Sequence, residues 1–199
     1  MKRRDFAINS VAAASLATLP LASLAQKRKD AVVLGMTLEP TGLDPTAGAA
    51  SAIAEIVQYN VFETLTKVNS DGSVTPLLAE SWEVSPDLKT YTFKLRKGVK
   101  FQNGEPFNAN TVKFSFERAA GEKSTNKDKR TFASMERVGV VDEHTVVVIN
   151  KELNPDFLFL MGQATAVIVE PKSADTNATK PVGTGPYKLD SWKQGASVT

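Results

Sequence analysis

The clearest pattern in the chain is an alternation of apolar and polar residues between positions 77 and 96. A period of two places the apolar side chains of a strand on one face of a sheet. The pattern predicts a hairpin whose first strand carries Trp82 and Val84 and whose turn is Ser85-Pro86-Asp87. In its second strand Tyr91, Phe93 and Leu95 share one apolar face. We expect Trp82, Tyr91 and Phe93 to be buried.

A helix is predicted directly after this hairpin. Asn108 is a residue type that caps helices, and Val112, Phe116 and Ala119 then recur at helical spacing. Asn103-Gly104 marks a turn between the hairpin and the helix. Nothing in this part of the chain has the arrangement of a catalytic site.

Shorter patterns predict the remaining elements. Ser51 is a candidate cap for a helix with an apolar stripe through Leu65, and Asp71-Gly72 is a turn between two short strands. Asp142-Glu143-His144 forms the turn of a second hairpin, which should expose His144, the single histidine. The other predicted elements are a short helix at 157–160 and strands at 31–36, 166–169 and 187–192.

The composition excludes several classes of protein. The 199 residues include 24 Lys and Arg against 22 Asp and Glu, so the formal charge of +2 gives no case for nucleic-acid binding. The absence of cysteine excludes disulfides and thiolate metal sites. One histidine leaves no metal motif and no supported Ser-His-Asp arrangement. We therefore predict no catalytic residue, no metal and no cofactor.

Residues 1–25 have the pattern of an export signal. Lys2 to Arg4 form a charged start, and the apolar run at 11–25 is too short to span a membrane. Ser23 and Ala25 are small residues at the usual cleavage spacing, so cleavage is expected after Ala25. Arg3-Arg4-Asp5-Phe6 resembles a twin-arginine export motif, with an ordinary Sec leader as the alternative. Either route places the mature protein in the periplasm.

Four segments of the chain stand out together: LDPT at 43–46, VFETL at 61–65, LAESWEVSPDLKTYTFKLRKGVKFQNGEPF at 78–107 and PVGTGPYKL at 181–189. In order and spacing they resemble the bacterial extracellular solute-binding proteins of family 5, which serve ABC importers of dipeptides, oligopeptides and nickel. The resemblance implies a mixed α/β fold of the two-lobed, cluster C periplasmic-binding-protein type, of which this chain would be a truncated N-terminal portion. The expected organisation is a signal peptide at 1–25, a first segment of the main lobe at 26–50, a small lobe at 51–180 and a return into the main lobe at 181–199.

The resemblance also implies a function. We expect a periplasmic monomer that captures a peptide or similar small solute and delivers it to ABC permease subunits, with no covalent chemistry. Alternative ligands are a nickel chelate, glutathione or an opine. The rival class is an exported hydrolase, and a partner of a periplasmic chemoreceptor would share the same binding chemistry.

The expected ligand contacts lie mainly in one glycine-containing segment. In relatives that bind peptides, the residues just after the Leu-Asp-Pro motif line the cleft, which here are Thr46, Ala47, Gly48, Ala49, Ala50 and Ser51. Their small side chains suggest that backbone groups make the contacts. A Gly48→Phe replacement should then weaken ligand binding strongly and leave the fold intact. Arg130 is a second candidate, because its guanidinium could bind a carboxylate of the ligand. It ends the polar segment at 121–130, which we interpret as a solvated loop. Phe132 is the only aromatic residue near this segment in the sequence.

Overall fold

A computed structural model describes residues 32–199, and the predicted export signal lies outside the described residues. The chain divides into two compact units, Met1–Gly35 and Met36–Thr199. In the first unit, residues 32–35 are exposed and form no strand. In the second unit, Met36 also lies outside any strand. The prediction of a buried strand at 31–36 is therefore wrong for its described residues: its apolar side chains have no layer to cover them.

The Met36–Thr199 unit mixes short helices with antiparallel strands. The helices are α1 (Ser51–Val57), α2 (Ala109–Ala120), α3 (Lys129–Ala133) and α4 (Phe157–Leu160), with 3-10 turns η1 (Ala164–Ala166) and η2 (Ala174–Thr176). The strands are β1 (Thr66–Val68), β2 (Val74–Pro76), β3 (Ala79–Val84), β4 (Thr90–Leu95), β5 (Met135–Asp142), β6 (Thr145–Asn150), β7 (Trp192–Lys193) and β8 (Ser197–Val198). No helix in residues 32–199 is long and apolar enough to cross a membrane.

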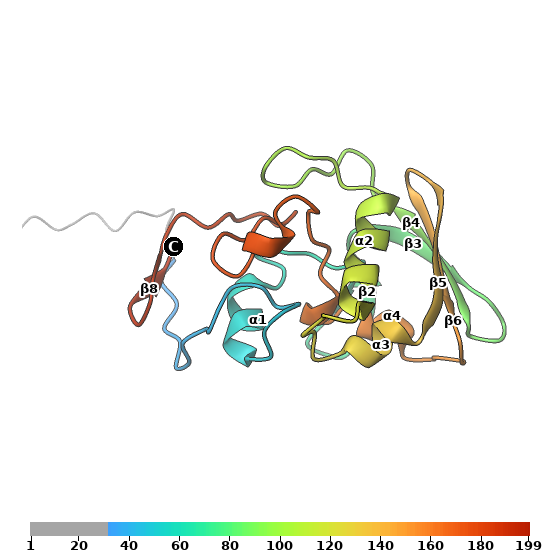
Figure 1. Ribbon diagram of the computed structural model, residues 1–199, viewed down its shortest axis with the longest axis horizontal. Helices are drawn as coiled ribbons and strands as arrows, with labels where there is room; N and C mark the ends of the chain where they lie inside the picture. Colours follow the sequence, from blue (N-terminus) through green and yellow to red (C-terminus); the bar gives the residue numbers. More distant parts are fainter. Residues whose placement is uncertain (1–31) are drawn as a thin grey trace, which may run out of the picture. The chain divides into compact units, whose positions relative to one another are not determined.

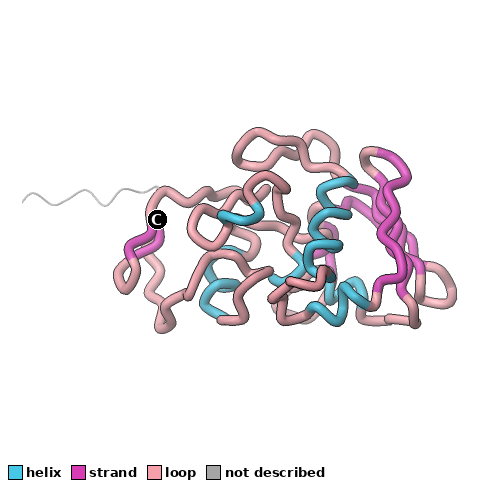
Figure 2. The backbone as a smooth tube through the Cα atoms, viewed as in Figure 1, coloured by secondary structure: helices cyan, strands magenta, loops and turns pink. Residues whose placement is uncertain are grey.

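The main sheet has four antiparallel strands in the order β3-β4-β6-β5. The two predicted hairpins supply its strands, and Phe93 of β4 lies between Trp82 of β3 and Val146 of β6. Tyr91 and Phe93 are buried, as predicted. Trp82 is only partly buried because β3 is an edge strand, so the prediction of full burial is wrong. Figure 2 shows these strands gathered together in magenta.

His144 lies in the turn between β5 and β6 and is half-buried rather than exposed. Its backbone carbonyl accepts a hydrogen bond of 2.8 Å from the amide of Leu95. This bond extends the β4 to β6 pairing into the turn and holds the histidine against the sheet. The predicted exposure was based on the turn alone and could not include this neighbouring strand.

The predicted helix α2 lies along one face of the main sheet (Figure 1). The Asn108 side chain accepts from the amides of Asn110 and Thr111, and the Thr111 hydroxyl accepts from the Asn108 amide, which completes a capping box. Phe116 and Phe132 pack with their ring centroids 5.6 Å apart. We call the apolar cluster between this helix and the sheet the sheet core; its largest buried members include Tyr91, Phe93, Phe101, Phe107, Phe116 and Phe157.

A second apolar cluster surrounds α1, and we call it the α1 core. Its buried members are Leu43, Ile53, Val57, Val61, Phe62, Val167, Val169 and Ala174. The helix is shorter than the predicted stripe because the chain leaves helical geometry after Val57, and Tyr59 has a φ of 61°. Ala50 occupies the cap position and Ser51 lies inside the helix, so the prediction of a Ser51 cap is wrong.

Two predicted strands are also wrong. The segment at 166–169 is buried but forms no strand. Ala166 ends the 3-10 turn η1, and the side chains that follow alternate between the two cores: Ile168 joins Ala166 in the sheet core, whereas Val167 and Val169 enter the α1 core. At 187–192 the only strand residue is Trp192, which begins β7 and pairs with β8. Apolar residues resembled a strand in both segments, but no ladder of backbone hydrogen bonds pairs 166–169 or 187–191 with a neighbouring strand.

Candidate functional site

The expected ligand segment begins in a tight, buried turn. The Asp44 carboxylate, only 3% exposed, accepts hydrogen bonds from the amide of Thr46 at 2.8 Å and from its hydroxyl at 2.6 Å. The Asp44 carbonyl accepts from the amides of Ala47 and Gly48 at 3.2 and 3.1 Å. Thr46 is thus engaged within the fold, and its side chain is directed to Asp44 rather than to solvent.

Gly48 lies over the α1 core. A Cβ atom added at this position would lie 2.4 Å from Cδ1 of Ile53, a fully buried residue. Any side chain at position 48 must therefore shift the end of the Ile53 side chain within the core. The effect of Gly48→Phe on the fold stays a prediction, and a neighbouring exposed position is a better probe of the segment.

The rest of the segment is small and accessible. Ala47, Ala49 and Ser51 are exposed, and Ala50 is partly exposed. The carbonyl of Ala47 accepts a hydrogen bond of 3.0 Å from the hydroxyl of Thr125. The segment therefore presents backbone and methyl groups at the surface. Gly48 packs on Ile53 beneath it, and Thr125 holds it through the Ala47 carbonyl.

Arg118 meets this segment, although sequence reasoning did not single it out. Its Nη1 donates to the Thr46 hydroxyl at 2.6 Å, and its Nη2 donates to the Asp44 carboxylate at 3.3 Å and to the carbonyl of Ala174 at 3.2 Å. Arg118 lies in the last turn of α2, and its side chain is 27% exposed. The sequence offered one signal for this role. Arg118 follows Phe114 by four residues, so the two share a face of α2, and Phe114 packs on the α1 core.

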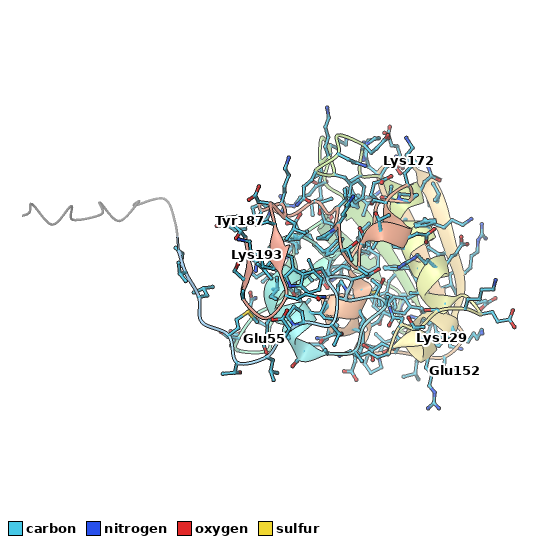
Figure 3. All side chains as sticks on the ribbon, turned by 60° about the vertical axis from the view of Figure 1, so that its left-hand side comes forward. Glu55, Lys129, Glu152, Lys172, Tyr187 and Lys193 are labelled. Atoms are coloured by element: carbon cyan, nitrogen blue, oxygen red, sulfur yellow. The ribbon has the colours of Figure 1, made fainter. Side chains whose placement is uncertain are left out.

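Arg130 is exposed on α3 and forms no ion pair within residues 32–199. Within residues 32–199, side-chain hydrogen bonds join the 46–51 segment to Arg118 and Thr125, and none joins it to Arg130. Phe132 is 3% exposed and belongs to the sheet core, so its ring is not free to face a ligand. Figure 3 labels Lys129, which precedes Arg130 on α3.

The polar segment at 121–130 is more than a solvated loop. Asn126 is 5% exposed, and its amide donates to the carbonyl of Thr165 at 2.9 Å. The Thr165 hydroxyl in turn donates to the Asp128 carboxylate at 2.7 Å. These bonds anchor the segment to the buried stretch at 164–169, which fixes the position from which Thr125 reaches Ala47.

The Gly183-Thr184-Gly185-Pro186-Tyr187 motif runs beside residues 60 and 61. The amides of Gly185 and Tyr187 donate to the carbonyls of Val61 and Asn60 at 2.9 and 3.0 Å. The ring of Tyr187 is 68% exposed and stands at the surface (Figure 3). The motif therefore binds to another part of the same chain and has no phosphate-loop geometry.

A hollow of about 810 Å³ lies next to this motif. Its lining includes Gln102, Lys180, Lys188, Asp190 and Trp192, and none of the residues at 46–51. Within residues 32–199 there is no group of three or more His, Cys, Asp or Glu side chains that could hold a metal ion. The arrangement suits noncovalent contacts to polar groups.

Comparisons with known proteins agree on one family. The model of the bacterial extracellular solute-binding proteins, family 5 Middle, matches residues 73–199. The glutathione-binding protein GsiB of Escherichia coli strain K12 is 32% identical over 190 residues, which cover 94% of this chain and 37% of GsiB. The chain thus spans a little over a third of the length of the curated relatives it matches.

Solved structures share the fold. The binding protein AgaA of A. tumefaciens R10, in complex with agropinic acid, superposes with a TM-score of 0.74 at 30% identity and covers 80% of this chain and 33% of AgaA. Haemophilus influenzae OppA, in complex with RPPGFSPFR, gives a TM-score of 0.73 at 26% identity over 80% of this chain and 36% of OppA. The predicted periplasmic-binding-protein fold is confirmed. The chain belongs to the bacterial extracellular solute-binding proteins of family 5.

Proposed function

We propose that the protein is the periplasmic substrate-binding component of an ABC importer, which captures a peptide or similar small solute and delivers it to permease subunits. The observation that carries this proposal is the family match over residues 73–199. The relatives bind glutathione, agropinic acid and the peptide RPPGFSPFR, and all three ligands carry carboxylate groups. Binding would act by stabilising one of two conformations, which the permease then recognises.

The ligand-facing part of this chain would be the segment at 46–51. Support comes from its exposed methyl and backbone groups and from its rigid attachment at Asp44 and Thr125. Backbone amides and carbonyls match the amides of a peptide whatever its side chains are. Arg130 would add a charge near a carboxylate from an exposed position. The division into a first segment at 26–50, a small lobe at 51–180 and a return at 181–199 remains part of the proposal.

The test is direct binding. The protein produced from its own gene should be purified under native conditions and the small molecules released on denaturation identified by mass spectrometry. Calorimetric titration with glutathione, agropinic acid and RPPGFSPFR, which we call the ligand panel, then measures affinity. We expect one bound or co-purifying solute that is recovered unchanged. Absence of any bound solute, or recovery of cleaved peptide as expected for an exported hydrolase, would contradict the proposal.

Export through the twin-arginine route, with cleavage after Ala25 and a monomeric mature protein, completes the proposal. It rests on Arg3 and Arg4 ahead of a moderately apolar run. Replacing both arginines with lysine should stop delivery to the periplasm, as measured by cell fractionation. Normal periplasmic levels of the variant would instead support a Sec leader, and N-terminal sequencing of the mature protein would test the cleavage position.

A further inference from the structure

We propose that Arg118 is a positioning residue for ligand capture: it holds the first turn of the 46–51 segment so that the segment meets the ligand already ordered. The inference rests on the proposed function, because it assigns a role within the same site. Arg118 itself touches Thr46, Asp44 and Ala174, and it acts on the ligand through the first two.

The segment cannot order itself. Four of its six residues are alanine or glycine, which offer no polar side chain and bury little surface. Ordering a residue's backbone costs roughly 1–2 kcal/mol of conformational entropy. A loop that is loose before binding adds this cost to the binding free energy, whereas a loop that is already held does not.

Besides the hydrogen bonds to Asp44 itself, three attachments hold the segment, and Arg118 supplies the first. The guanidinium bridges a carboxylate oxygen, a hydroxyl and a carbonyl from two distant parts of the chain, Asp44 with Thr46 and Ala174. Such a planar fork has no equivalent in lysine. The other attachments are the Thr125 bond to the Ala47 carbonyl and the insertion of Ile53 into the α1 core.

The geometry makes Arg118 decisive for the turn. Asp44 is 3% exposed, so removing its cationic partner leaves a buried carboxylate whose remaining donors are both on Thr46. A buried charge without its partner is unfavourable, and the turn can relieve it by opening toward water. Opening would release Ala47 and Gly48, whose amides bind the Asp44 carbonyl. Weaker ligand binding then follows from disorder rather than from a lost ligand contact.

The experiment compares Arg118→Gln and Arg118→Lys with Lys113→Gln, a control on the same helix that forms an ion pair with Glu117 at the surface. Each variant is titrated with the panel member that binds the native protein most tightly. Each is also made with Ala49→Cys, the single cysteine of the chain, which carries a nitroxide whose mobility is read by electron paramagnetic resonance. We expect Arg118→Gln to weaken affinity by about tenfold and to mobilise the label in the unliganded protein. For Arg118→Lys we expect an affinity and a label mobility between those of Arg118→Gln and the native protein. Lys113→Gln should change neither the affinity nor the label mobility.

The two readouts separate the possible failures. An immobile label in Arg118→Gln, or a mobile label with unchanged affinity, would overturn the positioning role while the native protein still binds its solute. A native protein that binds no solute would overturn the proposed function, whatever the label does. If Arg118→Gln fails to fold, Arg118→Lys, which keeps the charge, provides the same two measurements.

Discussion

Gln102 and Gly183 are joined by two hydrogen bonds in opposite directions. The amide of Gln102 donates to the carbonyl of Gly183 at 2.9 Å, and the amide of Gly183 donates to the side-chain oxygen of Gln102 at 3.2 Å. The Gln102 side-chain nitrogen then reaches the carbonyls of Val61 at 3.3 Å and Gly185 at 3.1 Å, and also that of Tyr187. A single amide thus ties together three segments that the family resemblance had matched separately.

This arrangement predicts a specific loss of stability. Gln102→Glu has the same shape but cannot donate, so it turns three favourable contacts into repulsions between oxygen atoms. We expect a loss of about 1–3 kcal/mol in the free energy of unfolding, measured by urea titration. Lys97→Ala, an exposed change in the same region, is the control. Equal stability of Gln102→Glu and the native protein would show that the bridge contributes nothing.

Gly183 should tolerate no side chain. An added Cβ would lie 1.9 Å from the carbonyl oxygen of Val61, and backbone cannot move aside as a flexible side chain can. We expect Gly183→Ala to lower the free energy of unfolding by about 3 kcal/mol or to prevent folding. Gly139→Ala in β5 is the matched control, because its nearest contact would be an ordinary 3.5 Å. Similar melting temperatures for both variants would contradict the prediction.

Glu63 should make stability depend on pH. Burial raises the pKa of its carboxyl above the ordinary value of 4.5, and the Thr184 hydroxyl and then the charge of Arg96 partly oppose that rise. The folded state therefore favours the protonated acid. The stabilisation from this preference is fully present below the ordinary pKa and is lost as the pH rises through the raised pKa.

Glu63→Gln removes this titration and stays neutral. We expect the variant to unfold at higher urea concentration than the native protein at about pH 7, with the difference shrinking toward about pH 4. Glu80→Gln, an exposed change on β3, should show no such trend. A constant difference between Glu63→Gln and the native protein across this range would contradict burial as the cause.

The elements that could be predicted from the sequence are those whose structure is determined by residues close to them along the chain. The hairpin around Tyr91 follows from the alternation of apolar and polar residues along its strands, and it is confirmed. The helix that begins after Asn108 follows from the capping bond between this residue and Thr111, three positions later, and it is also confirmed. Trp82 was misjudged because an edge position depends on the strand order, which the local pattern does not contain. The pairing of Arg118 with Asp44 joins residues 74 positions apart, and only the fold brings them together. The exposure of Ala49 beside the tightly packed Gly48 likewise depends on where Ile53 enters the α1 core.

Ala49 is the position at which the proposed ligand segment is best tested. Its side chain is exposed, so Ala49→Phe should change the stability by no more than about 0.5 kcal/mol. If the segment faces the ligand, a phenyl ring there occupies the ligand's space and covers the backbone groups that would bind it. We expect at least about a tenfold loss of affinity for the panel ligand, measured by calorimetry together with the melting temperature.

Ser81→Phe, an equally bulky change at an exposed position of β3, is the control and should bind the ligand with normal affinity. Normal affinity of Ala49→Phe, with a folded protein, would remove residues 46–51 from the site and leave the family assignment as it stands.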